Sequence, residues 1–320
     1  MTSPNPVTPN PVTVNPVMAT PAGRSGALTV AVRRAWRLPS VKLSIAVLAV
    51  VAAVAVLGSH LAPYDPLAQD PAQRLHGPSG LHWLGTDYLG RDVLSRLLAG
   101  TGMSVLGAAE AVAVGLALGV VPGLVSVFAG RAAEWAAMRV IDALLTLPFI
   151  VFVIAVVGIV GNGPHQAMAA LGLLFAPVFF RVTRTATLGF ARAQYVEAAE
   201  LAGASRARVL RVHILPKVLP TVAVTAAGAA GMALLAVSSL SFLGIGVAPP
   251  APTWGGMLAS DLGYLAQRPL APLAPALAIT ITVGALNALA DALRDSTGEH
   301  AAVPRRRRPQ QHADKEPNRA

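Results

Sequence analysis

Long apolar runs, not residues spaced at helix or strand periods, dominate this sequence. A helix needs roughly 20 mostly apolar residues to cross the hydrocarbon core of a bilayer. Several stretches meet or nearly meet this length, and short segments rich in turn-forming or charged residues separate them. We therefore predict an all-α polytopic membrane protein with six transmembrane helices, at about 43–62, 104–128, 140–160, 166–189, 218–243 and 273–293.

Charged and proline residues modify three of these spans. Arg181 and Arg184 interrupt the fourth stretch, so we expect its apolar part to end near Phe180 and the helix to continue into the cytoplasm. Pro122 and Pro148 fall inside the second and third spans, where a missing backbone N–H bends a helix.

The distribution of Lys and Arg predicts the orientation. With the N-terminus inside, the outer segments hold only four of the 25 Lys and Arg residues: Arg74, Arg91, Arg96 and Arg268. Because cytoplasmic segments carry the excess of Lys and Arg, both termini are expected to be cytoplasmic. The basic lead-in of about 42 residues and the later spans argue against a cleaved signal peptide.

The composition agrees with a membrane protein. Hydrophobic residues make up 54% of the chain and charged residues 12%, against roughly 25% charged in soluble domains. The inner basic segments account for the net charge of +10, so no nucleic-acid partner is expected. Residues 41–295 form the predicted membrane domain. The flanking segments 1–40 and 296–320 are predicted to be disordered cytoplasmic tails, with the arginines at 305–308 against anionic membrane lipid.

Catalytic and cofactor motifs are missing from the sequence. None of the three lysines (Lys42, Lys217 and Lys315) follows a glycine, so the chain lacks the phosphate-binding Gly-x-x-x-x-Gly-Lys loop. No histidine pair has metal-ligand spacing, and the chain has no cysteine. We expect no enzymatic activity, no metal site and no cofactor in this chain.

The segment 195–216 is the basic inner loop with the clearest local pattern. Residues 195–202 favour a short helix, Gly203 suits the left-handed position after it, and Ser205 suits the cap of a second helix. This second helix is predicted to run to about His213 and to stop before Pro216. One interpretation is an amphipathic helix lying on lipid. The small apolar surface of Ala198, Ala199, Leu201 and Ala202, beside Arg206, Arg208 and Arg211, favours docking against another protein.

Four motifs in order resemble one family of transporters. Glu197-Ala198-Ala199, followed by Gly203 and Leu215-Pro216, is similar to the loop of permease subunits in binding-protein-dependent ATP-binding-cassette (ABC) importers. Segments 82–96, 240–255 and 287–295 resemble the C-type subunits of the peptide and nickel branch, and the likeness extends over about 41–295.

The resemblance implies a type I importer permease in the bacterial cell membrane. It implies that the short helix of the loop fits a cleft on an ATPase subunit, through Glu197, Ala198, Ala199, Gly203, Ala204, Leu215 and Pro216. The implied partners are a second homologous permease, two ATPase subunits that bind ATP and magnesium, and an extracytoplasmic solute-binding protein. Di- or oligopeptides, nickel and glutathione-like solutes are all open as cargo. The alternative is a membrane channel or scaffold that uses no ATPase.

Other residues in the spans are weaker candidates. Small residues recur every four positions along one face of the second span and predict a packing seam, within the chain or against a partner permease; they are Gly107, Ala111, Gly115, Gly119 and Gly123. Glu110 and Asn287 are possible pathway residues. We expect Asp142 to reach the interface or pair with Arg139, and the outer segment 82–96 to form a short helix with local ion pairs.

Overall fold

The computed structural model describes residues 39–297, so the predicted tails 1–40 and 296–320 lie almost entirely outside the described residues. Within 39–297 the regular structure is helical, apart from one isolated bridge between Thr86 and Asp92. The helices are α2 (Pro39–Leu61), η1 (Pro71–Gln73), α3 (Val93–Ser126), α4 (Arg131–Thr146), α5 (Phe149–Val160), α6 (Pro164–Ala191), α7 (Gln194–Leu201), α8 (Arg206–Arg208), η2 (Val209–Ile214), α9 (Leu215–Phe242), α10 (Trp254–Leu262) and α11 (Leu273–Thr297).

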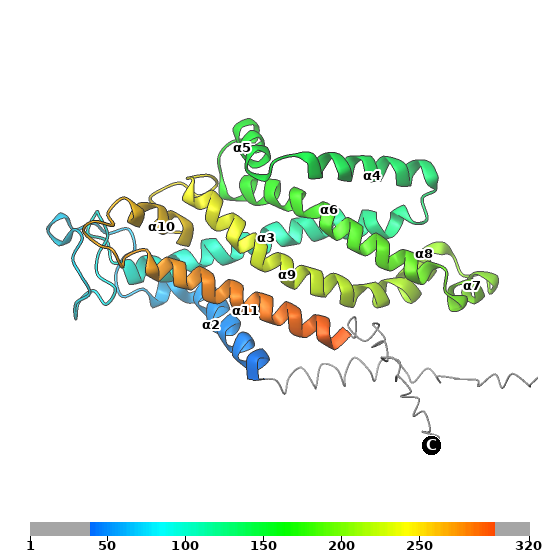
Figure 1. The fold of residues 1–320 in the computed structure, drawn as a ribbon, viewed down its shortest axis with the longest axis horizontal. Coiled ribbons are helices and arrows are strands. Elements are labelled where there is room, and N and C mark those ends of the chain that lie inside the picture. The colour runs from blue at the N-terminus through cyan, green and yellow to red at the C-terminus, as the bar shows by residue number, and fades with distance from the viewer. Residues whose placement is uncertain (1–38, 298–320) are drawn as a thin grey trace, which may run out of the picture.

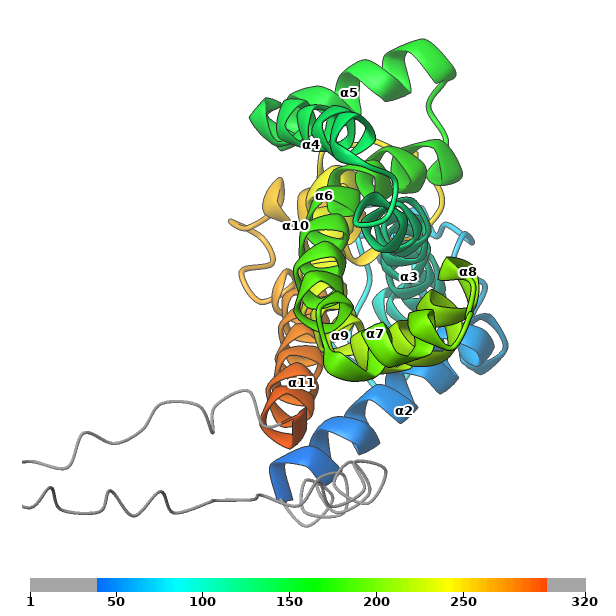
Figure 2. The same ribbon diagram turned by 90° about the vertical axis from the view of Figure 1, so that its right-hand side faces the viewer.

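The long helices form an elongated bundle. In Figure 1, α3, α6, α9 and α11 run along the long axis, with α10 and the segment 62–92 at one end and α7 and α8 at the other. Viewed from that second end, α4 and α5 lie on one side of the bundle and α2 on the opposite side (Figure 2). The basic segment 206–211 therefore lies at the end predicted to face the cytoplasm.

Five of the described helices are long and apolar enough to cross a membrane. The third predicted span, 140–160, is not one helix: α4 and α5 replace it and meet at an angle of 100°. Pro148 explains the break, because a proline holds the residue before it in extended conformation. Leu147 indeed has φ −80° and ψ 129°.

Two ion pairs attach α4 to α6. Arg181 donates to Asp142 at 2.8 Å, and Arg184 pairs with Glu134. The predicted partner of Asp142 was wrong, because the guanidinium of Arg139 lies over the ring of Trp135 instead. Both arginines that interrupt the fourth stretch thus bind α4, and α6 continues past them to Ala191 as predicted.

The most extensive helix contact is between α3 and α6, at the glycines of the predicted seam. A methyl group placed on Gly119 would lie 2.5 Å from the carbonyl oxygen of Ala176, and one on Gly123 would lie 2.8 Å from that of Phe180. Gly115 lies similarly close to Phe175. The main apolar core surrounds this contact, with Ala108, Ala111, Met168, Phe179 and Leu234 among its members.

The outer segment does not form the predicted helix over 82–96. Residues 82–92 form a loop, and α3 begins at Val93, about a dozen residues before the predicted start of its span. Asp92 caps α3 by accepting from the backbone N–H of Ser95 at 2.7 Å. Because Asp92 at the end of this loop caps α3 directly, no separate short helix precedes α3 over residues 82–92.

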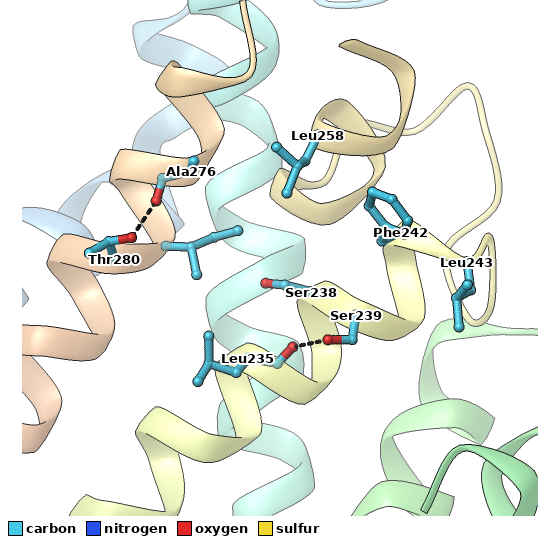
Figure 3. Close-up of a pocket in the computed structure, with 9 residues that line it drawn as sticks. Leu235, Ser238, Ser239, Phe242, Leu243, Leu258, Ala276 and Thr280 are labelled. Carbon is cyan, nitrogen blue, oxygen red and sulfur yellow. Dashed lines mark hydrogen bonds between the residues drawn. The ribbon is translucent and has the colours of Figure 1, made fainter. Parts of the chain in front are cut away.

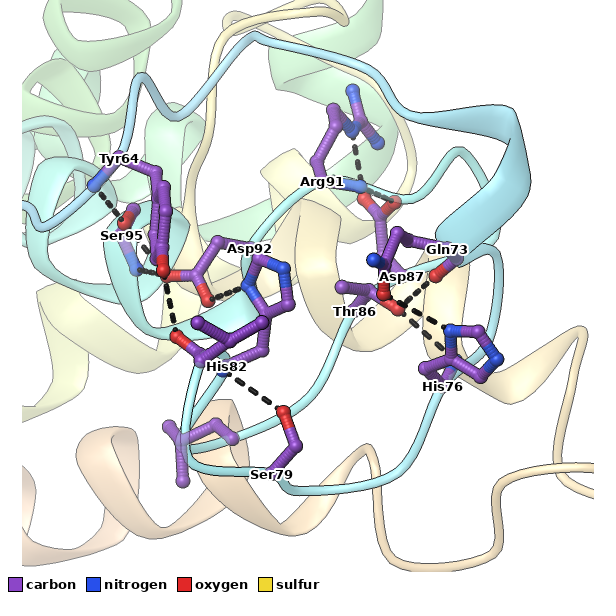
Figure 4. A network of polar contacts seen from close by, with 12 residues as sticks. Tyr64, Gln73, His76, Ser79, His82, Thr86, Asp87, Arg91, Asp92 and Ser95 are labelled. Atoms are coloured by element: carbon purple, nitrogen blue, oxygen red, sulfur yellow. Dashed lines mark hydrogen bonds and ion pairs between the residues drawn. The ribbon is translucent and has the colours of Figure 1, made fainter.

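The predicted ion pairs of the outer loop are present. Asp87 accepts from the Nε of Arg91 at 2.7 Å and lies 3.5 Å from the Nε of Arg96, while His82 contacts Asp92 at 2.9 Å (Figure 4). From the far end of the chain, Arg268 donates to the carbonyl oxygens of His76, Thr86 and Leu84. This network joins two loops distant in sequence.

Asp261 on α10 faces the same network. Its residue is 7% exposed, and its Oδ2 has no hydrogen-bond partner among the described residues. Burial, and then the nearby Asp87, raise the pKa of Asp261 to about 6, although Arg268 and Arg96 act in the opposite direction. The folded protein therefore favours the protonated form more than the unfolded chain does.

We predict that Gly119→Val lowers the stability of the folded subunit by about 1–3 kcal/mol, because the new side chain forces α3 away from α6. The measurement is the melting temperature of the purified protein in detergent. Gly284→Val is the control, since a methyl group on Gly284 of α11 meets nothing within 4 Å. Equal melting temperatures for both variants would contradict the packing role of Gly119.

We predict that Asp261→Asn removes a pH-dependent loss of stability. Because folding raises the pKa of Asp261 from 3.8 to about 6, the buried carboxyl is protonated below pH 4 and does not destabilise the folded protein. As the pH rises through about 6, the carboxyl becomes charged in its buried position, and the folded protein loses stability. The melting temperatures of wild type and variant should agree at pH 4 and diverge in favour of the variant by pH 7.5. A constant difference across this range would refute the titration of Asp261.

Candidate functional site

The segment 194–217 begins with α7, a short helix that follows directly on α6. Its C-terminus has the two hydrogen bonds of a Schellman motif. The backbone N–H of Gly203 donates to Glu200 at 2.9 Å, and that of Ala204 donates to Ala199 at 3.0 Å. Gly203 has φ +84°, a conformation in which a Cβ is strained, so the residue type that ends α7 is fixed by the backbone.

The second helix of the segment begins as predicted but does not end as predicted. Ser205 caps α8 by accepting from the backbone N–H of Arg208 at 3.4 Å. Instead of stopping before Pro216, the chain passes through the π-helical turn η2 into α9. Leu215 donates to Leu210, five residues back, and the wider turn accommodates the proline that follows. Residues 206–242 therefore form one helical run.

An apolar cluster holds the inner face of the segment against the bundle. Val196 of α7, Val209 and Ile214 of η2 and Val218 of α9 are at most 2% exposed and pack with Leu124 of α3. Three of the predicted docking residues lie partly buried against this cluster: Ala199, Ala204 and Leu215. Their side chains serve the attachment of the segment to the bundle.

A cation–π contact adds a second attachment. The Nζ of Lys217 lies 3.3 Å from the ring centroid of Tyr195 and 5.9 Å from that of Phe190. This contact links the first turn of α9 to α7 and to the end of α6. Sequence reasoning missed this role of Lys217, because the contact depends on packing between helices that no local pattern indicates.

The outer face of the segment is free. Glu197, Ala198, Gly203 and Pro216, the other predicted docking residues, are exposed. Leu201 is 84% exposed, and Arg206, Arg208 and Arg211 are exposed beside it. The structure therefore presents a small apolar surface with a basic border, fixed from behind by the apolar cluster.

The two pathway candidates lie apart. Glu110 of α3 meets the Nδ1 of His165 at 3.0 Å, and both line a cavity of about 340 Å³ between α2, α3 and the start of α6. Asn287 is exposed on α11, with its Oδ1 directed at Gly231 of α9, and does not line this cavity. Sequence reasoning missed His165, although an acid inside a span requires a partner.

These helices define a polytopic membrane protein with a small, exposed apolar surface bordered by arginines at one end. Residues 111–297, more than half of the chain, match the family of binding-protein-dependent transport system inner membrane components. The chain belongs to this family of ABC importer permeases, located in the bacterial inner membrane.

The names of three related proteins specify three different transported solutes. The chain is 38% identical over 245 residues to the glutathione transport system permease protein GsiD of Pectobacterium atrosepticum, covering 76% of this chain and 81% of that protein. It is 36% identical to the nickel permease NikC of Escherichia coli (82% and 94% covered) and to the di/tripeptide permease DppC of Pseudomonas aeruginosa (76% and 82% covered).

Membership of this family bears on two sequence-based predictions. Its members are transport permeases, so the chain is a transport subunit and not an enzyme. Importers of this kind imply an ATPase and a solute-binding protein as partners. The alternative of a channel or scaffold without an ATPase is not favoured.

Proposed function

We propose that this chain forms half of the translocation pathway of an importer for di- or oligopeptides or a similar small solute. A second, homologous permease forms the other half, and an external binding protein delivers the solute. Two ATPase subunits bind ATP and magnesium on the cytoplasmic side, so this chain holds no cofactor of its own. The peptide, glutathione and nickel relatives support an importer of small polar solutes and leave these three cargoes as the candidates.

The observation that carries the coupling role is the two-sided construction of the segment 194–217. Its outer face exposes Leu201 and Ala198, which suit a shallow cleft on an ATPase subunit. Its inner face is fixed to α9 by the apolar cluster and by Lys217. A displacement of the outer face is therefore transmitted to the membrane helices.

Electrostatics supports the same role. Arg206, Arg208 and Arg211 border the apolar surface, and none of them forms an ion pair among the contacts recorded for residues 39–297. An acidic rim on the ATPase would match them and steer its approach. The switch between inward and outward access requires the ATPase to bind these two states with different affinity.

We predict that Gly203→Val uncouples ATP hydrolysis from transport while leaving membrane insertion intact. The substitution meets no neighbouring atom within 4 Å, but it places a β-branched residue at φ +84°, at a cost of about 1–2 kcal/mol. Uptake and ATPase activity are measured in proteoliposomes containing the whole importer. Gly189→Val is the control, because Gly189 has equal space in a regular helix. Wild-type uptake by the Gly203 variant would refute the coupling role.

We predict that Leu201→Asp reduces co-purification of the ATPase subunits at least tenfold, because it puts a charge into the apolar contact. The amount of ATPase retained on the tagged permease after detergent extraction measures the effect. Leu270→Asp is the matched control: Leu270 is 72% exposed but lies in the loop between α10 and α11, at the opposite end of the bundle. If both variants retain the ATPase equally, Leu201 lies outside the interface.

A further inference from the structure

A pocket of about 410 Å³ lies between α9, α10 and α11 (Figure 3). Its volume falls in the usual range for small-molecule sites. Leu235 and Phe242 of α9, Leu258 of α10 and Ile279 of α11 form its apolar walls. None of the nine residues that line it is charged, and its only side-chain polar atoms are hydroxyl groups.

The three hydroxyl groups differ in one respect. Ser239 donates to the carbonyl oxygen of Leu235 at 2.9 Å, and Thr280 donates to that of Ala276 at 2.8 Å. Such bonds within a helix satisfy the hydroxyl proton and leave the oxygen able to accept. Ser238, by contrast, is 7% exposed and its Oγ has no hydrogen-bond partner among the described residues.

The unpartnered hydroxyl points into the pocket. In Figure 3 the oxygen of Ser238 is directed from α9 across the pocket toward α11. Leaving a buried hydroxyl unpaired is unfavourable, and a ligand that supplies a donor or acceptor removes this penalty. The position of Ser238 is fixed, because Gly255 of α10 packs so closely on its backbone carbonyl that a methyl group would lie 2.0 Å from the oxygen.

We propose that this pocket holds the uncharged backbone of a peptide-like solute during transport, with the Ser238 hydroxyl as its polar contact. The inference rests on the proposed importer function and narrows its cargo. An amide supplies both an N–H for the oxygen of Ser238 and a carbonyl for its proton, while the apolar walls accept small side chains. A nickel ion prefers imidazole, carboxylate or thiolate ligands, and the pocket has none.

The pocket is also mechanically connected to the proposed ATPase contact. The helical run from Arg206 to Phe242 carries the basic segment at one end and Ser238 near the other. Pro216 and Ser238 are separated by roughly 33 Å along the axis, at 1.5 Å per residue. Because α11 forms the opposite wall, a shift of α9 and the attached α10 relative to α11 changes the shape of the pocket.

Cysteine labelling tests occupancy directly, since the chain contains no cysteine. Ser238→Cys is prepared in the complete importer with cysteine-free partner subunits and treated with a methanethiosulfonate reagent. A mixture of hydrophobic dipeptides should slow labelling at least fivefold, and nickel sulfate should not. Thr225→Cys, on the same helix outside the pocket, is the control and should show no protection. Absence of peptide protection, or protection by nickel, would overturn the assignment.

Transport by Ser238→Ala gives an independent measurement. Loss of one hydrogen bond to the solute should lower dipeptide uptake about tenfold. The melting temperature of the variant should not fall, because the wild-type hydroxyl has no partner among the described residues. Thr225→Val should transport at the wild-type rate. Unchanged uptake by the Ser238 variant overturns the pocket assignment alone. If the wild-type complex shows no ATP-dependent uptake of dipeptide, glutathione or nickel, the proposed function itself is wrong.

Discussion

The close approach of α3 and α6 is the contact on which the rest of the bundle depends. Lipid is as apolar as the side chains between two helices, so helices in a bilayer associate mainly through close van der Waals packing. Gly119 and Gly123 allow this packing, because their missing side chains admit the α6 backbone. α6 in turn holds α4 through Arg181 and Arg184 and leads directly into α7. The position of the segment 194–217 therefore follows from the α3–α6 contact.

The transmembrane spans could be predicted where hydropathy alone determines the structure. In a bilayer each backbone polar group must be hydrogen-bonded within the segment, so a long apolar run forms a helix, as in α2 and α11. The prediction was wrong where a tertiary contact changes the effect of a charge. The second span was predicted to start at residue 104, whereas α3 begins at Val93, where Asp92 caps it and Asp87 pairs with Arg96 in its first turn. The sharp bend at Pro148 was taken for a kink because the ion pairs that hold α4 on α6 join residues far apart in sequence.

In the candidate site, too, local features could be predicted from the sequence, whereas features that depend on packing could not. Gly203 and Ser205 were predicted correctly in their local roles, because a left-handed residue and a helix cap depend only on neighbouring backbone groups. The π-helical turn and the contact of Lys217 with Tyr195 depend on packing across three helices, and no local pattern indicates them. For the same reason, a sequence motif cannot separate Ala198, which is exposed, from Ala199, which packs inward.

The construction of the segment 194–217 determines how it can transmit movement. A π-helical turn interrupts the regular α-helical hydrogen bonds and is a common place for a helix to kink. Here, however, Val209 and Ile214 within the turn are fully buried, and Lys217 beyond it binds back to α7. These contacts bridge the turn, so α7 and the start of α9 move together. Under the proposed coupling, a force on the exposed face of α7 would be carried along α9 to the outer half of the bundle, where Ser238 faces α11.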